Sequence, residues 1–305
     1  MKLIVDCSLT GRRAAQQPNA GPPAFPLATG GTETVITQGG KFYRVHTFLS
    51  SGTLTVTREG KFEYLVIGGG GGGGGRGAGG GGAGEVYKFV AGEAHNTAIV
   101  PIDLAIGTHS IVVGLGGNGG ANAAGENGTG QNGQNTTAFG IEALGGSGGT
   151  NNRDAPDGGS GGGSGEQNNA SGQAIGSGLG NNGAIGANTA TNRRGGGGGG
   201  AVAVGEAGDA ISSVVPGRGG AGVLCAISGA DEYYAGGGAG SHFQDIHTAT
   251  GGIGGGGDSK ANGENGRGGG GGGGTSLAGN AGSGGSGIVI IRYEITEADY
   301  NAEAA

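Results

Sequence analysis

Eight consecutive glycines, Gly68–Gly75, follow a strand-like run that ends at Ile67. Glycine is a poor helix former and has no side chain to bury, so such a run builds neither an α-helix nor an apolar core. Similar blocks recur along the chain, and 87 of its 305 residues are glycine. This composition excludes an ordinary helical or α/β enzyme and is typical of low-complexity chains. However, the net charge is only −7, so self-repulsion does not force the chain open.

Several of these blocks have glycine at every third residue, for example Gly114, Gly117 and Gly120. A period of three is that of the left-handed polyproline II helix, which has no internal hydrogen bonds. Its peptide groups are therefore free to bond neighbouring chains. With only 7 prolines and no sustained Gly-X-Y register, a collagen triple helix is excluded. We therefore predict a bundle of polyglycine-II-like helices, with loose glycine loops as the alternative.

Short runs of β-branched and aromatic residues between the glycine blocks predict strands. Four of them have the spacing of hairpins and predict an antiparallel β-meander: Thr32–Thr37, Lys41–Leu49, Thr53–Thr57 and Lys61–Ile67. Further strands are expected at Glu85–Val90, Asn96–Ile102, Thr108–Val113, Thr137–Leu144, Ala201–Val204, Ala210–Val215, Val223–Ser228 and Gly287–Ile295. No window has apolar residues at the period of an α-helix. The predicted fold class is all-β and extended: short antiparallel β-strands followed by a glycine-rich, polyglycine-II-like helix bundle, with no α-helix.

The chain divides into four segments by composition. Residues 1–30 contain prolines that favour extended backbone, and they read as an attachment arm or linker: Pro18, Pro22, Pro23 and Pro26. Residues 31–67 form the expected β-meander, residues 68–295 the glycine-rich β and polyglycine-II domain, and residues 296–305 a C-terminal tail.

Charge and hydropathy exclude several classes of partner. Lys and Arg are scattered through a weakly acidic chain, which argues against nucleic-acid binding. No apolar run reaches the roughly 20 residues that span a bilayer, so we expect no membrane insertion. The apolar stretch at the start is too short for a signal peptide, so synthesis in a cytoplasm without export by that route is expected. Cys7 and Cys225 lie far apart, and we interpret them as unpaired thiols, with Cys225 buried in a strand. An intermolecular disulfide of either cysteine stays open.

A series of landmarks resembles the glycine-rich domain of bacteriophage tail fibres and adhesins, which are receptor-binding proteins. In chain order these landmarks are YRVHTFLSSGTLTVTREGKFEYLVIGGGGGGGG (43–75), THSIVVGLGGNGG (108–120), NTTAFGIEALGGSGG (135–149), ISGADEYYAGGGAG (227–240) and GGSGIVIIRY (284–293). The resemblance covers roughly residues 31–295. It implies a virion protein that binds its host with the loops between stacked polyglycine-II helices. Residues 1–30 would then attach it to other tail or baseplate proteins, and no coiled-coil shaft is present.

Polar and aromatic residues between the glycine blocks are the candidates for receptor binding, because aromatic and arginine side chains dominate binding hot spots. They are Arg153, Asp154, Asn168, Asn169, Arg193, Arg194, Tyr233, Tyr234, His242, Phe243 and His247. The alternative is that they form turns, which favour Asn and Asp. For Tyr233 and Tyr234 the resemblance implies a strand that enters a glycine block, and hence packing. A weaker hypothesis is a metal site made by His242, Asp245 and His247.

No arrangement of residues indicates catalysis or a cofactor. The acids are dispersed, and no nucleophile is paired with a base. The segment LVIGGGGG (65–72) lacks the following helix that a dinucleotide site needs. We expect a phage tail-fibre or tail-tip adhesin in the virion that binds a host-surface saccharide or an outer-membrane protein. It would be a homotrimer, with a monomeric tip on another fibre as the alternative. The alternatives are a purely structural fibre or matrix component and an ice-binding protein.

Overall fold

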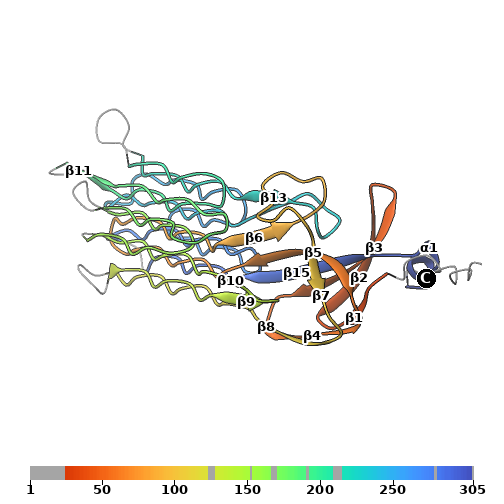
Figure 1. Ribbon diagram of the computed structural model, residues 1–305. Coiled ribbons are helices and arrows are strands. Elements are labelled where there is room, and N and C mark those ends of the chain that lie inside the picture. The colour runs from red at the N-terminus through yellow and green to blue at the C-terminus, as the bar shows by residue number, and fades with distance from the viewer. Residues whose placement is uncertain are drawn as a thin grey trace, which may run out of the picture.

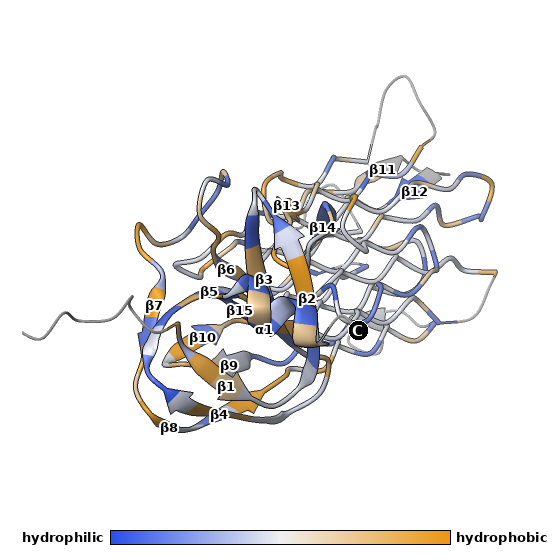
Figure 2. Ribbon diagram, turned by 90° about the vertical axis from the view of Figure 1, so that its right-hand side faces the viewer, coloured by the Kyte–Doolittle hydropathy of each residue, from blue (hydrophilic) through white to orange (hydrophobic). Residues whose placement is uncertain are grey.

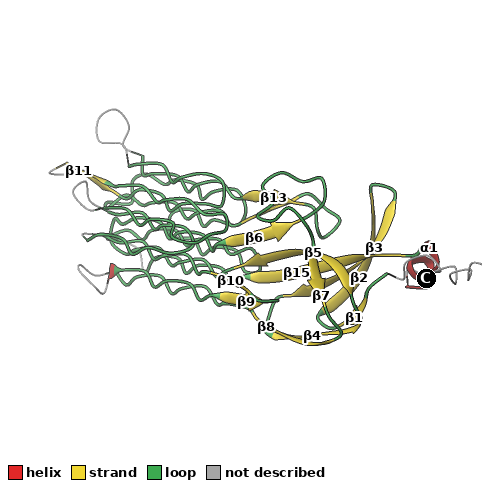
Figure 3. Cartoon of the chain, viewed as in Figure 1, coloured by secondary structure: helices red, strands yellow, loops and turns green. Residues whose placement is uncertain are grey.

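The computed structural model describes residues 25–122, 128–151, 153–165, 170–189, 192–208, 215–277 and 280–303. Two parts lie end to end in the elongated molecule (Figure 1). Paired strands form the part that carries the C-terminus, and a bundle of extended glycine-rich segments forms the other part. Apart from short hairpins and one helical residue, Gly128, the bundle segments are neither strand nor helix (Figure 3). The fold is therefore nearly all β and extended, as the sequence predicts.

All strand pairs between named elements are antiparallel. One sheet has the order β2-β3-β15-β5-β6, with β7 paired to β5, and a second has the order β1-β4-β8-β9-β10. Two separate hairpins are β11–β12 and β13–β14. The strands are β1 (Leu27–Thr29), β2 (Thr32–Gln38), β3 (Lys41–Phe48), β4 (Gly52–Arg58), β5 (Gly60–Ile67), β6 (Val86–Phe89), β7 (Ile102–Leu104), β8 (Gly107–Val112), β9 (Thr136–Ala138), β10 (Ile141–Ala143), β11 (Ala187–Thr189), β12 (Asn192–Arg194), β13 (Val223–Cys225), β14 (Glu232–Tyr234) and β15 (Ile288–Ile295).

The central strands β5 and β15 are buried on both faces. On one face Val66, Val289 and Ile291 pack against the second sheet. On the other face Leu65 and Ile290 pack with residues of the β13–β14 hairpin. The strand part is thus three layers deep, and hydrophobic residues colour its strands, whereas the bundle segments are pale (Figure 2).

The meander expected for residues 31–67 is not the observed strand order. β15 lies between β3 and β5, with Ile291 opposite both His46 and Tyr64. β4 leaves this sheet and pairs with β1 and β8. The reason is that β15 is apolar on both faces, so it is best buried at the centre of a sheet that is covered on both sides.

Three further expectations need correction at the ends and in the loops. Ala28 of β1 is fully buried, so the end of the segment read as an arm belongs to the core. Of the strand expected at Asn96–Ile102, only Ile102 lies in a strand, and Ala201–Val204 forms bends and coil rather than a strand. Most of Ala210–Val215 lies outside the described residues. The strand expected at Thr137–Leu144 is instead the β9–β10 hairpin.

A short helix, α1 (Glu297–Glu303), occupies the segment read as a tail, where no helix was predicted. The backbone amide of Asp299 donates to Thr296 Oγ1 at 3.1 Å, and the Thr296 hydroxyl donates to the Asp299 carboxylate at 2.7 Å. This reciprocal capping stabilises a helix start. Tyr300 then packs against Phe42, with ring centroids 4.9 Å apart. Seven residues are too few to show a helical period in the sequence, so only the cap could have revealed this helix.

The bundle is held by backbone hydrogen bonds that repeat every three residues. In the segment 68–75, successive amides point to three different neighbours in turn, at N···O distances of 2.7–3.0 Å. The segments that accept are 79–85, 128–134 and 282–285. The segments that donate to its carbonyls are 117–120, 146–149 and 271–274. A three-residue period with neighbours on all sides is the packing of polyglycine-II helices, and the bundle prediction is confirmed.

At most positions inside the bundle, close contact between backbones leaves no room for a side chain. A Cβ atom on Gly73 would lie 2.2 Å from the carbonyl oxygen of Gly272. A Cβ atom on Gly70 would lie 2.0 Å from the carbonyl oxygen of Gly269. Contacts this short involve rigid backbone, so a substitution forces whole segments apart. The long glycine runs are therefore a steric requirement of the packing.

At the surface of the bundle, Asn side chains accept the hydrogen bonds that a neighbouring backbone segment accepts in the interior. Asn262 Oδ1 accepts from the Ser283 amide at 2.9 Å, and Asn265 Oδ1 accepts from the Ser286 amide at 3.0 Å. The two backbone donors are three residues apart, and so are the two Asn acceptors. One row of Asn side chains therefore accepts the hydrogen bonds of the backbone N–H groups along one face of a segment. Asn132 and Asn135 serve the segment that begins at Gly145 in the same way.

We predict that Gly73→Ala lowers the free energy of unfolding by at least about 3 kcal/mol, because the new methyl group overlaps a fixed carbonyl. Gly52→Ala is the matched control, since a Cβ there would lie 3.5 Å from Phe48 in ordinary contact. Urea denaturation of both variants is the measurement. Equal stability of the two variants would contradict the steric account.

We predict that Asn265→Ala lowers the free energy of unfolding by about 1 kcal/mol, because the Ser286 amide loses its acceptor. The control is Asn118→Ala, because among the described residues the Asn118 side chain hydrogen-bonds only the side chain of Gln131. Faster hydrogen exchange of the Ser286 amide in Asn265→Ala, and not in the control, would locate the effect. An unchanged exchange rate would show that this side chain does not cap the segment.

His46 is fully buried, and its burial lowers the pKa of its ring below 6.5 despite the nearby Gly30 carbonyl and Glu33. As the pH falls below 6.5, the unfolded chain binds a proton that the folded chain resists, so stability must fall. We predict that the free energy of unfolding falls more steeply in wild type than in His46→Gln when the pH is lowered from 7 to 5. The difference between the two slopes should be up to about 1 kcal/mol per pH unit. Urea midpoints at both pH values test this, and parallel slopes would refute it.

Candidate binding surface at the tip of the bundle

The bundle segments end, far from the sheets, in a group of turns and the β11–β12 hairpin (Figure 1). The segment 68–75 starts where β5 ends and runs to this tip, where it turns at Arg76. Interior positions admit only glycine and other small residues, so large side chains collect where the segments turn. The tip is therefore the part of the bundle where chemistry can concentrate.

Two polar stretches lie side by side at the tip. Arg194 and His242 form an antiparallel bridge, and the Phe243 amide donates to the Arg193 carbonyl at 2.9 Å. The Phe243 ring lies 5.4 Å from the guanidinium carbon of Arg193 and 5.6 Å from that of Arg76. These are cation–π distances.

The structure thus brings together five of the predicted receptor-binding residues and Asp245 of the metal hypothesis, and it adds Arg76. We call this set the tip cluster: Arg76, Arg193, Arg194, His242, Phe243, Asp245 and His247.

The two histidines of the tip cluster are close but do not form a metal site with Asp245. Their rings lie 5.7 Å apart. His242 Nδ1 accepts from the Gln244 amide at 3.0 Å, and Asp245 pairs with Lys260 at 2.7 Å. Among the described residues, no group of three or more His, Cys, Asp or Glu side chains could hold a metal ion. Burial lowers the pKa of His242, and His247 and Arg194 lower it further.

Arg194 is the unusual member of the cluster. The residue is 4% exposed, and its Nε and Nη1 atoms are buried without a hydrogen-bond partner. A buried and unpaired charge is strongly unfavourable in a folded protein. Nearby, Arg76 and Asp245 have positive φ angles of 68° and 58°. Non-glycine residues adopt this conformation only where the surroundings fix it.

Sequence reasoning missed Arg76 and Lys260. Arg76 interrupts two glycine runs, and an isolated charged residue there was a readable sign of a turn. Lys260, which pairs with Asp245, lies 15 positions away, and no sequence pattern indicates that contact.

The other predicted candidates lie elsewhere. Asp154 Oδ1 accepts from the Ala170 amide at 2.6 Å, and Asp157 repeats the contact with Gln173 three residues on. Asp154 therefore caps a bundle edge. The carbonyl of Arg153 accepts from the Thr150 hydroxyl at 2.6 Å. Asn168 and Asn169 lie outside the described residues.

Tyr233 and Tyr234 lie on β14, near the sheets and away from the tip cluster. Tyr234 is 2% exposed and donates its hydroxyl to Glu232 at 2.6 Å, and burial raises its pKa. Tyr233 is 37% exposed. Tyr234 thus packs, as a strand residue that enters a glycine block would.

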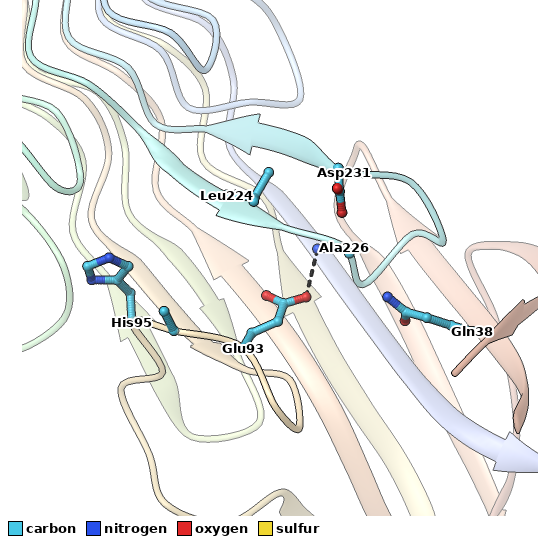
Figure 4. A pocket seen from close by; sticks show the side chains of 7 residues that line it. Gln38, Glu93, His95, Leu224, Ala226 and Asp231 are labelled. Carbon is cyan, nitrogen blue, oxygen red and sulfur yellow. Dashed lines mark hydrogen bonds between the residues drawn. The ribbon is translucent and has the colours of Figure 1, made fainter. Parts of the chain in front are cut away.

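A cavity of about 230 Å³ lies beside the β13–β14 hairpin (Figure 4). Its lining residues are Gln38, Glu93, Ala94, His95, Leu224, Ala226 and Asp231. The Glu93 carboxylate accepts from Lys88 Nζ at 2.6 Å and from the Ala226 amide at 2.8 Å. Its charge is therefore already neutralised by the buried Lys88.

Cys225 is buried in β13 as an unpaired thiol, as predicted, and burial raises its pKa to about 12. At neutral pH it is therefore protonated and a poor nucleophile. Cys7 lies outside the described residues.

The family model described as a glycine-rich domain matches residues 47–294, most of the chain. A search of curated proteins gives no match to this chain. In the part of the chain that the structure describes, no helix has the length and apolar character needed to cross a bilayer.

Proposed function

The chain belongs to the glycine-rich domain family, and from that premise we propose that it is a tail-fibre or tail-tip adhesin of a bacteriophage. In this proposal it binds the host cell surface and catalyses no reaction. The main support for this proposal is the tip cluster, which places an aromatic ring and several cations at the free end of a tightly hydrogen-bonded bundle. Sequence landmarks from residue 43 to residue 293 that resemble phage adhesins support the same assignment.

The two ends of the molecule suit different partners under this proposal. The described N-terminal strand β1 and the C-terminal helix α1 lie in the strand part, opposite the tip (Figure 1). Attachment to other tail or baseplate proteins through residues 1–30 would leave the tip cluster facing outward. The receptor would be a host-surface saccharide or an outer-membrane protein. We further propose that the protein is a homotrimer in the virion.

The rival function is a purely structural fibre or matrix component without receptor binding. The repeated backbone bonding favours it equally, because a bundle of this kind is a stiff building block in either case. The tip cluster separates the two, since a structural component needs neither the aromatic ring nor an unpaired buried arginine.

We predict that the purified protein binds candidate host cells saturably and blocks phage adsorption, and that Phe243→Ala weakens this binding at least about tenfold. Phe139→Ala is the matched control, because Phe139 is a partly buried phenylalanine of the strand part, outside the tip cluster. Labelled protein on whole cells and counts of unadsorbed phage are the two readouts.

Two outcomes would contradict this prediction. Failure to bind any cell type, with antibodies still decorating the virion, would leave the structural component. Equal binding by Phe243→Ala and wild type would place the receptor site outside the tip cluster.

A further inference from the structure

The tip cluster concentrates positive charge in a protein whose net charge is −7. Asp245 is its one carboxylate among the described residues, and that charge is neutralised by Lys260 at 2.7 Å. The Arg76 guanidinium lies over the Phe243 ring, and no carboxylate in the described ranges pairs with it. The cluster is therefore left with a positive excess.

Part of this excess is held beneath the surface by Arg194. Two of its three guanidinium nitrogens are buried without a hydrogen-bond partner. Water screens a buried charge much less than an exposed one, so its field acts strongly on groups close by. The pKa of His242 responds to this charge: burial lowers it, and the charges of His247 and Arg194 lower it further.

Arginine is suited to one class of ligand in such a place. Its guanidinium recognises carboxylate and phosphate groups through strong charge-assisted hydrogen bonds. Phe243 adds an apolar surface beside Arg76 and Arg193. A sugar ring presents apolar C–H groups to an aromatic ring, while an acidic substituent on the same ring can reach the cations.

We propose that the tip cluster binds an anionic saccharide, with the sugar ring against Phe243 and its carboxylate or phosphate group held by Arg76 above the buried charge of Arg194. This rests on the proposed function and deepens it by naming the class of receptor. A neutral saccharide would leave Arg194 without compensation, whereas an acidic one supplies the missing negative charge. Selectivity for acidic sugars should therefore weaken as salt concentration rises.

The test compares three probes that share one hexose ring: glucose, glucuronate and glucose 6-phosphate. Titrations of the full chain, followed by NMR, should show that at least one charged sugar binds about tenfold more tightly than glucose. Comparing the two charged sugars distinguishes a carboxylate from a phosphate receptor. Equal affinity for all three, or no binding at roughly tens of millimolar sugar, would overturn the proposal.

Three variants assign the effect to this site. Arg194→Gln should abolish the preference for the charged sugar, and Arg194→Lys should retain most of it. The lysine variant keeps the charge, so its behaviour separates electrostatics from a folding defect, with unfolding curves measured for both. Lys61→Gln removes one exposed cation from β5 and should change nothing. Loss of preference in Lys61→Gln would indicate a general charge effect instead.

The adsorption assay keeps the two proposals separate. Cell binding without any preference for acidic sugars would reject the anionic ligand and leave the adhesin. A clear preference for acidic sugars, with no binding to any cell, would reject the adhesin and leave the anion site.

Discussion

Hydrogen bonds between neighbouring backbones hold the bundle together and determine which residues the chain can use there. Each central segment bonds to neighbours in three directions in turn, which requires a repeat of three residues and backbones in direct contact. That contact leaves no space for a Cβ atom at most interior positions, as at Gly70 and Gly73. Functional side chains are consequently confined to the turns, and the asparagines at bundle edges complete the bonding. The tip cluster lies where the segments turn, outside this packed interior.

The bundle and most strands could be predicted because their signals are local. Glycine at every third residue indicates the polyglycine-II period, and alternating β-branched residues indicate β2 to β5. The position of β15 could not be predicted, because its pairing with β3 and β5 joins residues more than 200 positions apart. The same holds for the tip, where Arg76 meets Phe243 through the stacking of segments. His242, Phe243 and Arg193 could be predicted because they are charged or aromatic residues between glycine blocks. Asp154 and Tyr234 have the same sequence signal, but their side chains make hydrogen bonds within the fold.

Two kinds of stabilisation meet in this molecule. The sheets bury apolar side chains in two clusters, one on each face of β15. The bundle is instead stabilised by hydrogen bonds between backbone groups. Serine hydroxyls add to these bonds, as where the Ser241 hydroxyl donates to the Gly274 carbonyl. The strands set the starting register of several segments, since 68–75, 114–120 and 145–150 each follow a strand end. The apolar sheets therefore determine where the bundle segments start, and the backbone hydrogen bonds of the bundle determine how these segments pack. Both are needed to define the position of the tip.

A bundle without an oily interior has an uncommon response to temperature. The heat capacity of unfolding comes mainly from apolar surface exposed to water, while exposed peptide groups reduce it. The glycine segments expose peptide groups and very little hydrocarbon when they separate. Their unfolding heat capacity per residue should therefore fall well below the roughly 12–15 cal/mol/K of ordinary globular proteins. The stability curve of this part of the molecule is correspondingly flat, so its free energy of unfolding changes little between cold and warm conditions.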